Sequence, residues 1–194
     1  SGIGGMEVFE RESIVLHEKG AKRVSPLFIP TMISNMAAGN LAIRYGLKGD
    51  CLNIVTACST GTHCVGEAYR LIRFGLADAA LAGGTEEGIT NMSLAGFGNL
   101  GAITKSDDPM KAGLPFDARR SGFVAGEGAG ALVLESLEHA QARGANIIAE
   151  ITGFGSTGDA YHMTAPEPSG EGAVRAMRQA LAEGGFSLEE VGHL

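Results

Sequence analysis

The residue best suited to chemistry is Cys58, which lies in the string T-A-C-S-T-G. An apolar run over 52–57 precedes it and a helical pattern over 59–74 follows, so it falls where a predicted strand turns into a helix. Unpaired backbone N–H groups at a helix start favour a thiolate and can hold the oxyanion formed when that thiolate attacks a thioester. We therefore predict Cys58 as a nucleophile; the alternative is an inert packed cysteine.

A metal site is the second possibility at this position, because His63 and Cys64 follow Cys58 closely. The pattern is C-x4-H-C on a helix, so its side chains do not converge on one face. No second ligand pair follows at the spacing of a structural zinc site. We predict no metal and interpret His63 and Cys64 as ordinary helix packing.

A second group of polar residues lies in the string G-F-G-S-T-G-D-A-Y-H-M-T over 153–164, after a predicted strand. We interpret it as a functional loop. The alternative is a solvated loop in which His162 binds backbone groups. The glycine strings 83–84 and 126–130 do not fit a phosphate-binding loop, because an apolar strand pattern, not a helix, follows the second. We predict close backbone packing at both.

These residues need elements to position them, and the apolar pattern alternates in type. Helices are predicted over 30–45, 59–74, 135–143 and 172–183, and a loop is predicted over 106–116. Strands are predicted over 52–57, 79–82 and 147–151, with one or two more within 123–134. The order strand, helix, strand over 52–82 predicts a βαβ unit with parallel strands. The fold class is therefore α/β.

Composition limits the function. The 194 residues carry a net charge of −7 and are 44% hydrophobic, which fits one sizeable core and argues against disorder and against a nucleic-acid partner. No apolar run is long enough to cross a bilayer, and three cysteines fit a reducing cytoplasm rather than a disulfide scaffold. Because the chain starts at Ser1 and stops soon after a helix, we expect it to be part of a longer protein.

Four motifs in order resemble the elongating β-ketoacyl-acyl-carrier-protein synthases: T-A-C-S-T-G, A-G-G-T-E, F-D-A-R-R-S-G-F-V-A-G-E-G-A-G-A-L-V-L-E and G-F-G-S-T-G-D-A-Y-H-M-T-A-P. The resemblance implies a partial thiolase-like fold, layered α-β-α-β-α with mixed sheets. Residues 1–144 would be the later part of the N-terminal half and 145–194 the start of the C-terminal half. It also implies a cytoplasmic homodimer of fatty acid biosynthesis, without cofactor, that acts on acyl and malonyl carrier protein.

Residue roles follow from the same resemblance. Cys58 matches the nucleophile that accepts an acyl chain before condensation with malonyl carrier protein. The other matched positions are Ile3, Phe28, Ala57 and Phe97 at the acyl pocket, His162 and Thr164 at the pantetheine and gating loop, and Lys22 and Arg23 at the carrier-protein surface. Phe28 is expected to reach the partner subunit's pocket. The sequence departs from the family at Gly101, where another basic contact falls, and at Ser121, where many members have Asp.

The family's two catalytic histidines, in N-A-H-G-T and K-x-x-x-G-H, do not occur in these 194 residues. We therefore expect this chain alone to be inactive in condensation. The alternatives are a polyketide ketosynthase domain, a thiolase, a non-catalytic subunit resembling a chain-length factor, and an inactive remnant. The presence of Cys58 argues against the non-catalytic subunit, because such subunits usually lack this cysteine, whereas the missing ends leave the inactive remnant open.

Overall fold

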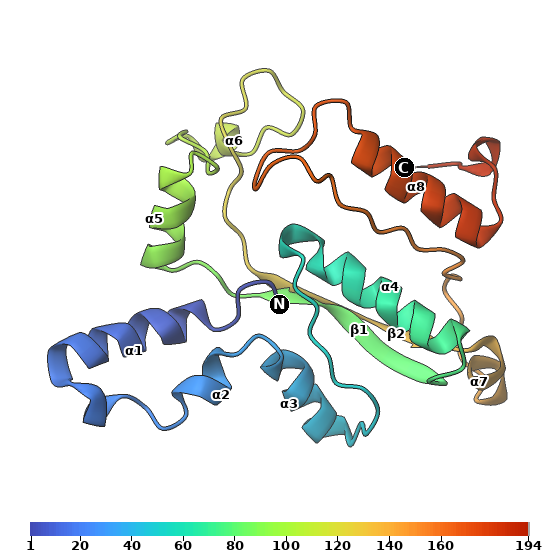
Figure 1. Ribbon diagram of the computed structural model, residues 1–194, viewed down its shortest axis with the longest axis horizontal. Helices are drawn as coiled ribbons and strands as arrows, with labels where there is room; N and C mark the ends of the chain where they lie inside the picture. Colours follow the sequence, from blue (N-terminus) through green and yellow to red (C-terminus); the bar gives the residue numbers. More distant parts are fainter. Residues whose placement is uncertain (194) are drawn as a thin grey trace. The chain divides into compact units, whose positions relative to one another are not determined.

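The computed structural model describes residues 1–193, and the chain forms two compact units that alternate along the sequence. The first unit contains residues 1–61 and 83–131, and the second contains 62–82 and the residues from 132 onward. These units do not coincide with the sequence division at residue 144. Helix α4 and strands β1 and β2 each continue from one unit into the other (Figure 1).

The first unit begins with helical segments: α1 (Met6–Lys19), the short 3₁₀ helix η1 (Ala21–Arg23), α2 (Phe28–Met32) and α3 (Met36–Tyr45). The predicted single helix over 30–45 is wrong, because the chain leaves the helical conformation at Ile33 (φ −66°, ψ 138°) and re-enters it at Met36. The predicted end at Tyr45 is confirmed, whereas the helical segment begins at Phe28, two residues before the predicted start. Helix α1 was not predicted; it is followed by Gly20 with φ +80°, a conformation that favours glycine.

The first unit also contains α5 (Asn91–Asn99) and α6 (Pro109–Ala112). Thr90 is the N-cap of α5. Its side chain accepts a hydrogen bond from Ser93 N, and the Ser93 side chain accepts one from Thr90 N. Helix α6 is a single turn inside the predicted loop 106–116, with Asp108 as its N-cap and Pro109 in its first turn.

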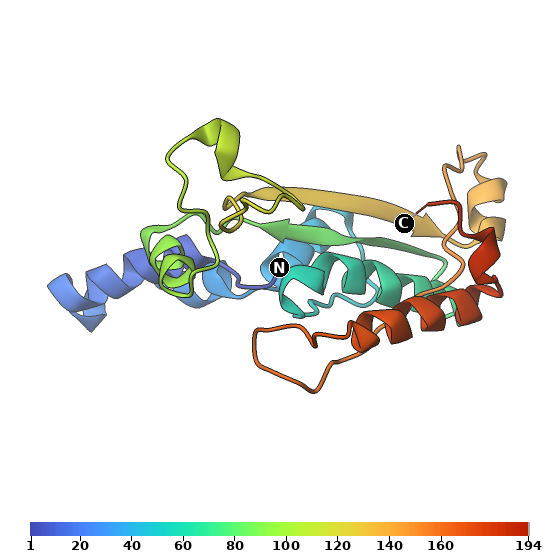
Figure 2. The ribbon, with the colours of Figure 1, turned by 90° about the horizontal axis from the view of Figure 1, so that it is seen from above.

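The only sheet in the described residues consists of β1 (Ala79–Glu86) and β2 (Gly128–Glu135), which run side by side in Figures 1 and 2. The pairing is antiparallel, since Ser136 N donates to Asp78 O while Gly83 lies against Gly130. The predicted strand over 79–82 is confirmed and extends further. The strand predicted within 123–134 is confirmed only from Gly128, because Phe123 forms no more than an isolated bridge with Ile103.

Two predicted strands, 52–57 and 147–151, are not strands in this structure. A strand requires a hydrogen-bonded neighbour, and no strand pairs with either segment within residues 1–193. The predicted parallel βαβ unit is therefore wrong for this structure. The helix between its expected strands is nevertheless present as α4 (Thr60–Arg73).

The second unit contains most of α4 together with α7 (Leu137–Ala142), α8 (Glu171–Gly184) and the 3₁₀ helix η3 (Leu188–Glu190). Helices α7 and α8 confirm the helices predicted over 135–143 and 172–183. The segment 153–155 packs directly on helix backbones: a Cβ on Gly66 of α4 would lie 2.4 Å from the Phe154 ring, and a Cβ on Gly155 would lie 1.9 Å from Ala176 O of α8. Glycine is required at both positions.

The predicted close backbone packing is confirmed at Gly83 and Gly84, and the second string takes part in it through the backbone of Gly130. A Cβ on Gly83 would lie 2.0 Å from Gly130 O, and a Cβ on Gly84 would lie 3.0 Å from Gly61 Cα. By contrast, Cβ atoms on Gly126, Gly128 and Gly130 would meet nothing within 4 Å. Among residues 1–193, no helix combines the length and the apolar character needed to span a membrane.

Candidate active site

Cys58 lies at the tip of a tight elbow formed by the 3₁₀ turn η2 (Ala57–Ser59), directly before α4. Ala57 adopts φ +51°, a left-handed conformation that costs an L-residue energy and is found mainly at special sites. Ser59 N donates to Thr56 O at 3.0 Å, and Thr56 N donates to the buried Thr60 Oγ1 at 3.0 Å. These bonds on both sides fix the elbow and present Cys58 to solvent.

The start of α4 can approach β1 closely because two glycines face each other there. A Cβ on Gly84 would lie 3.0 Å from Gly61 Cα, closer than ordinary van der Waals contact. Gly61, the glycine of T-A-C-S-T-G, and Gly84, the second glycine of A-G-G-T-E, therefore contact each other. This contact fixes the helix start, and so the N–H groups that follow Cys58, against the strand.

The three cysteines are all free thiols, and accessibility alone does not distinguish them. Cys51 and Cys58 are exposed, and Cys64 is half-buried. Only Cys58 combines exposure with a position at a helix start, where partial positive charge favours an anion. His63 packs edge-on against Phe154 with ring centroids 5.5 Å apart, as expected for helix packing.

The segment Ser1–Ile3, which contains the predicted pocket residue Ile3, lies beside the elbow. A Cβ on Gly2 would lie 3.5 Å from Ala57 O and 3.2 Å from Glu86 Oε2. Glu86, the last residue of β1, accepts hydrogen bonds from Gly2 N at 2.8 Å and Ile3 N at 3.2 Å. The structure therefore brings Ile3, Ala57 and Cys58 into one neighbourhood.

The other two predicted pocket residues, Phe28 and Phe97, belong to the same unit as Cys58 and are half-buried. Each belongs to an aromatic pair. The Phe28 ring lies 6.5 Å from that of Phe9, and the Phe97 ring contacts that of Phe123 edge-on at 5.4 Å between centroids. These pairs join α2 to α1, and α5 to the segment before β2.

The predicted basic pair, Lys22 and Arg23, forms the exposed end of η1. The buried Glu12 of α1 accepts a hydrogen bond from Ser25 N at 2.8 Å and thereby fixes the chain just beyond the pair. This backbone donor is the main reason that the pKa of Glu12 lies below its usual value. Gly101, where the family has a basic contact, has φ +73°, so a side chain there would be strained.

His162 and Thr164 belong to the second unit, in the loop that precedes α8, drawn in orange in Figure 2. The exposed His162 accepts hydrogen bonds at Nδ1 from Thr164 N and Ala165 N, both at 3.1 Å. Asp159 accepts another from Glu167 N at 3.0 Å. In this structure His162 binds backbone groups, as the alternative interpretation of the loop expected.

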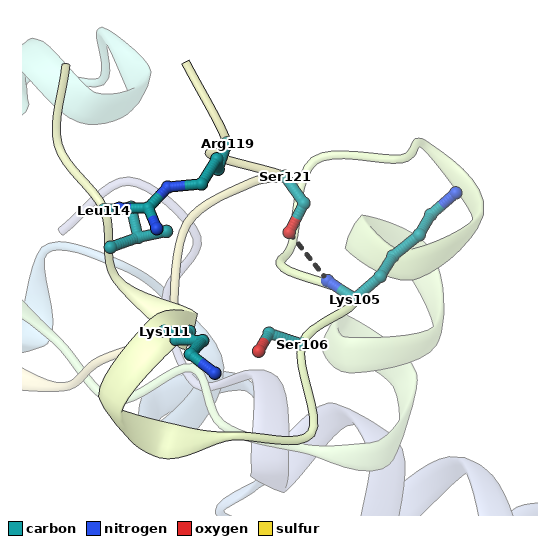
Figure 3. A pocket seen from close by; sticks show the side chains of 6 residues that line it. All are labelled: Lys105, Ser106, Lys111, Leu114, Arg119 and Ser121. Atoms are coloured by element: carbon teal, nitrogen blue, oxygen red, sulfur yellow. Dashed lines mark hydrogen bonds between the residues drawn. The ribbon is translucent and has the colours of Figure 1, made fainter. Parts of the chain in front are cut away.

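A cavity of about 290 Å³ lies in the first unit, and none of its lining residues is a predicted site residue. Lys111 and Arg119 line it, but they pair with Asp108 and Asp117 at 3.2 and 2.7 Å. Figure 3 shows the Lys105 side chain pointing away from Lys111. Ser121 Oγ accepts a hydrogen bond from Lys105 N at 3.2 Å, which gives this departure from the family a local structural role. Two of its three cationic side chains are therefore paired with carboxylates, and no predicted site residue lines it, so the cavity is not the candidate site.

Sequence reasoning did not identify Glu86, Glu12 or Asn53, which hold the segments that carry predicted site residues. Asn53 Nδ2 donates to Ser1 O at 3.1 Å and to Ser34 Oγ at 2.9 Å. The partners that fix these segments are 13 to 85 residues away in the chain. The one available indication was the position of Glu86 at the end of the quoted motif A-G-G-T-E.

Comparison with known proteins places this site in a family. Residues 2–140 match the model of the β-ketoacyl synthase N-terminal domain, and residues 148–194 match that of the C-terminal domain. The chain belongs to the β-ketoacyl synthase family. It is 54% identical over its full length to 3-oxoacyl-[acyl-carrier-protein] synthase 2 of Staphylococcus aureus, of which it covers 48%.

Solved structures of β-ketoacyl synthases share the fold. One from Burkholderia phymatum matches the whole chain with a TM-score of 0.90 at 37% identity, and the chain covers 47% of it. A ketosynthase of a type II polyketide synthase, solved with its acyl carrier protein and a bound hexaketide, matches 92% of the chain with a TM-score of 0.86 at 34% identity, and 46% of that chain is covered. The predicted α/β class and thiolase fold are confirmed. The chain spans about half the length of the relatives it matches.

Proposed function

We propose that this chain belongs to a β-ketoacyl-acyl-carrier-protein synthase of fatty acid biosynthesis, in which Cys58 is the nucleophile. The observation that carries the proposal is the elbow itself: an exposed thiol at a helix start, held by a left-handed Ala57 and by the buried Thr60. The 54% identity to a 3-oxoacyl-[acyl-carrier-protein] synthase 2 supports the same reaction.

The first half-reaction is a thioester exchange. The Cys58 thiolate attacks the carbonyl carbon of an acyl chain on acyl carrier protein, a carbon–sulfur bond forms, and the carrier's thiolate leaves and takes up a proton. Backbone N–H groups at the start of α4 are suited to stabilise the oxyanion of the tetrahedral intermediate. In the second half-reaction, malonyl carrier protein loses carbon dioxide. The electron pair left on carbon attacks the acyl carbonyl, and Cys58 leaves as a thiolate.

The remaining predicted residues take supporting roles. The acyl pocket is lined by Ile3, Phe28, Ala57 and Phe97. Phe28 also reaches the acyl pocket of the second subunit in a homodimer. His162 and Thr164 lie at the pantetheine arm, while Lys22 and Arg23 meet the acidic carrier protein. Both basic residues are exposed, which a docking role requires. Complementary charge would mainly accelerate encounter.

The first test is covalent acylation of the full-length protein by acyl carrier protein that bears a saturated acyl chain, followed by intact mass. Cys58→Ala should abolish the adduct. Cys51→Ala is the matched control, since Cys51 is also exposed but does not precede a helix, and it should acylate normally. An adduct that persists in Cys58→Ala would overturn the proposal.

The second test separates an active synthase from a non-catalytic subunit. Malonyl carrier protein is added to the acylated full-length protein, and the β-ketoacyl product is measured by mass spectrometry. A synthase releases product with one equivalent of carbon dioxide. A subunit resembling a chain-length factor would form no adduct alone, and product would appear only after a second ketosynthase is added.

A further inference from the structure

We propose that Glu86 is a positioning residue that holds Ser1–Ile3 against the Cys58 elbow and thereby sets the length of acyl chain accepted. The inference rests on the proposed function, because it takes Ile3 as part of the acyl pocket and Cys58 as the acylated residue. Glu86 need not touch the substrate. It acts through the backbone that places Ile3.

The first argument is the concentration of hydrogen bonds on one carboxylate. Glu86 Oε1 accepts from Ser1 Oγ at 2.9 Å, and Oε2 accepts from Gly2 N at 2.8 Å and from Ile3 N at 3.2 Å. Three consecutive residues therefore donate hydrogen bonds to the two oxygens of this carboxylate. Bonds to an ionised acceptor are stronger than bonds between neutral groups, and a half-buried site screens them less than open solvent would.

The second argument is that the acceptor is itself fixed. Glu86 is the last residue of β1, whose backbone pairs with β2 and packs through Gly84 on the start of α4 at Gly61. Strand β1 therefore positions both the Glu86 carboxylate and the elbow that carries Cys58. A segment that binds Glu86 takes its position from the element that also positions Cys58.

The third argument is that the segment is held from a second direction. Asn53, which precedes the elbow, donates to Ser1 O at 3.1 Å, and Ser1 Oγ accepts from Gly4 N at 2.9 Å. Space is also limited, because a Cβ on Gly2 would lie 3.2 Å from Glu86 Oε2. Ile3 cannot move toward or away from the elbow without breaking several of these bonds.

The two substitutions of Glu86 should differ in a diagnostic way. Glu86→Ala removes the acceptor and leaves the Gly2 and Ile3 N–H groups without a protein partner, so the segment loosens. Glu86→Gln keeps one acceptor oxygen for these N–H groups. Its NH2 group can donate to Ser1 Oγ, because a hydroxyl can accept as well as donate. Rescue by Gln would indicate that geometry, more than charge, sets the pocket.

The experiment measures kcat/KM for Cys58 acylation in the full-length protein, with acyl carrier proteins that bear a series of saturated chains. In Glu86→Ala the ratio of the long-chain to the short-chain value should change about tenfold, the order that one or two methylenes are worth in an apolar pocket. Glu86→Gln and the control Glu87→Ala should keep the ratio within about twofold. Glu87 is the exposed neighbour of Glu86.

Two further measurements keep the result decisive. Ile3→Phe tests the pocket itself and should shorten the longest chain accepted. If Ile3→Phe leaves the length profile unchanged, the pocket assignment in the proposed function fails. If it changes the profile while folded Glu86→Ala does not, the positioning role of Glu86 is refuted. Should Glu86→Ala not fold, Glu86→Asp replaces it, because the shorter side chain withdraws both oxygens from Ser1, Gly2 and Ile3 and keeps the carboxylate: a changed length profile supports the positioning role of Glu86, and an unchanged one refutes it.

Amide hydrogen exchange supplies a readout that does not depend on activity. Exchange at Gly2 and Ile3 should accelerate about tenfold or more in Glu86→Ala, because both amides lose their acceptor. It should stay unchanged in Glu87→Ala. Equal protection in wild type and Glu86→Ala would show that other groups hold the segment, and would refute the proposal.

Discussion

The two units bury different kinds of side chain. The buried polar residues, Glu12, Thr60 and Ser93, all belong to the first unit. The buried apolar residues all belong to the second: Ala68, Tyr69, Ala82, Ala140 and Phe154. Each buried polar side chain accepts a hydrogen bond from backbone near a predicted site residue: Glu12 from Ser25 N beyond Lys22–Arg23, Thr60 from Thr56 N at the elbow, and Ser93 from Thr90 N at the start of the helix that bears Phe97.

This difference suggests a division of labour between directional and non-directional forces. A hydrogen bond fixes a position to a few tenths of an ångström, whereas apolar packing stabilises without specifying direction so closely. In the second unit, the Phe154 ring packs on Gly66 and Tyr69 OH donates to Thr152 O at 2.7 Å, so apolar packing and a hydrogen bond together hold the base of the loop, while the hydrogen bonds of His162 and Asp159 stay inside the loop. In the first unit, buried side chains fix the segments that carry candidate residues through hydrogen bonds. In the second unit, buried side chains hold the base of the loop, and the residues around His162 are held by hydrogen bonds within the loop.

The largest effect is expected at the apolar anchor. Phe154→Ala should lower the free energy of unfolding of the full-length protein by about 3 kcal/mol, since it removes a buried ring that contacts Gly66, His63 and Arg70. Urea denaturation measures the loss. Under native conditions the variant should still acylate Cys58. A loss below about 1 kcal/mol would break the contrast between the units.

The elbow's polar anchor should give a smaller loss of stability but a larger loss of function. Thr60→Val deletes the acceptor for Thr56 N at an almost unchanged volume, which should cost about 1 to 3 kcal/mol and slow acylation of Cys58. Thr60→Ser keeps the hydroxyl and is the matched control. Equal acylation rates in the Val and Ser variants would contradict the idea that this bond shapes the elbow.

The hydrogen bond from Ser25 N to Glu12 should make the local stability of this segment depend on pH. The pKa of Glu12 is lowered in the folded protein, mainly by the Ser25 N–H, so this contact stabilises above the usual glutamate value of 4.5 and is lost as pH falls through the lowered value. Amide exchange over residues 21–27 of the full-length protein should therefore accelerate below about pH 4.5 beyond the intrinsic pH effect. Glu12→Gln should remove that extra dependence, and an identical pH profile in both proteins would contradict the assignment.

The smallest effect is expected at the loop tip. His162→Ala removes the acceptor of Thr164 N and Ala165 N at an exposed site, so the unfolding free energy should change by less than about 0.5 kcal/mol. If the loop meets the pantetheine arm, KM for acyl carrier protein should rise a few-fold while kcat is little changed. His162→Asn, which can accept similar bonds, should restore KM; no change in KM with either variant would remove His162 from the site.

The sequence predicted features that depend on neighbours along the chain. Cys58 before a helix, α4, α8 and the strand at Ala79 all follow from local periodicity and from glycine positions. Features that depend on distant partners were predicted wrongly or missed. The strand predicted over 52–57 has no paired neighbour and is absent, and the roles of Glu86 and Glu12, which were missed, depend on backbone donors elsewhere in the first unit. A glutamate that binds backbone looks the same in sequence as a solvated one.

The contact between Gly61 and Gly84 also limits how ketosynthases can be recombined. A Cβ on Gly84 would lie 3.0 Å from Gly61 Cα, so a side chain at position 84 would push α4 away from β1, whereas a Cβ on Gly61 would lie at an ordinary 3.6 Å from Gly84 Cα. Chimaeras with crossover points between Thr56 and Glu86 would separate residues that must be inherited together. Breakpoints placed before Thr56 and after Glu86 would transfer the nucleophile, its helix and its strand as one exchangeable cassette.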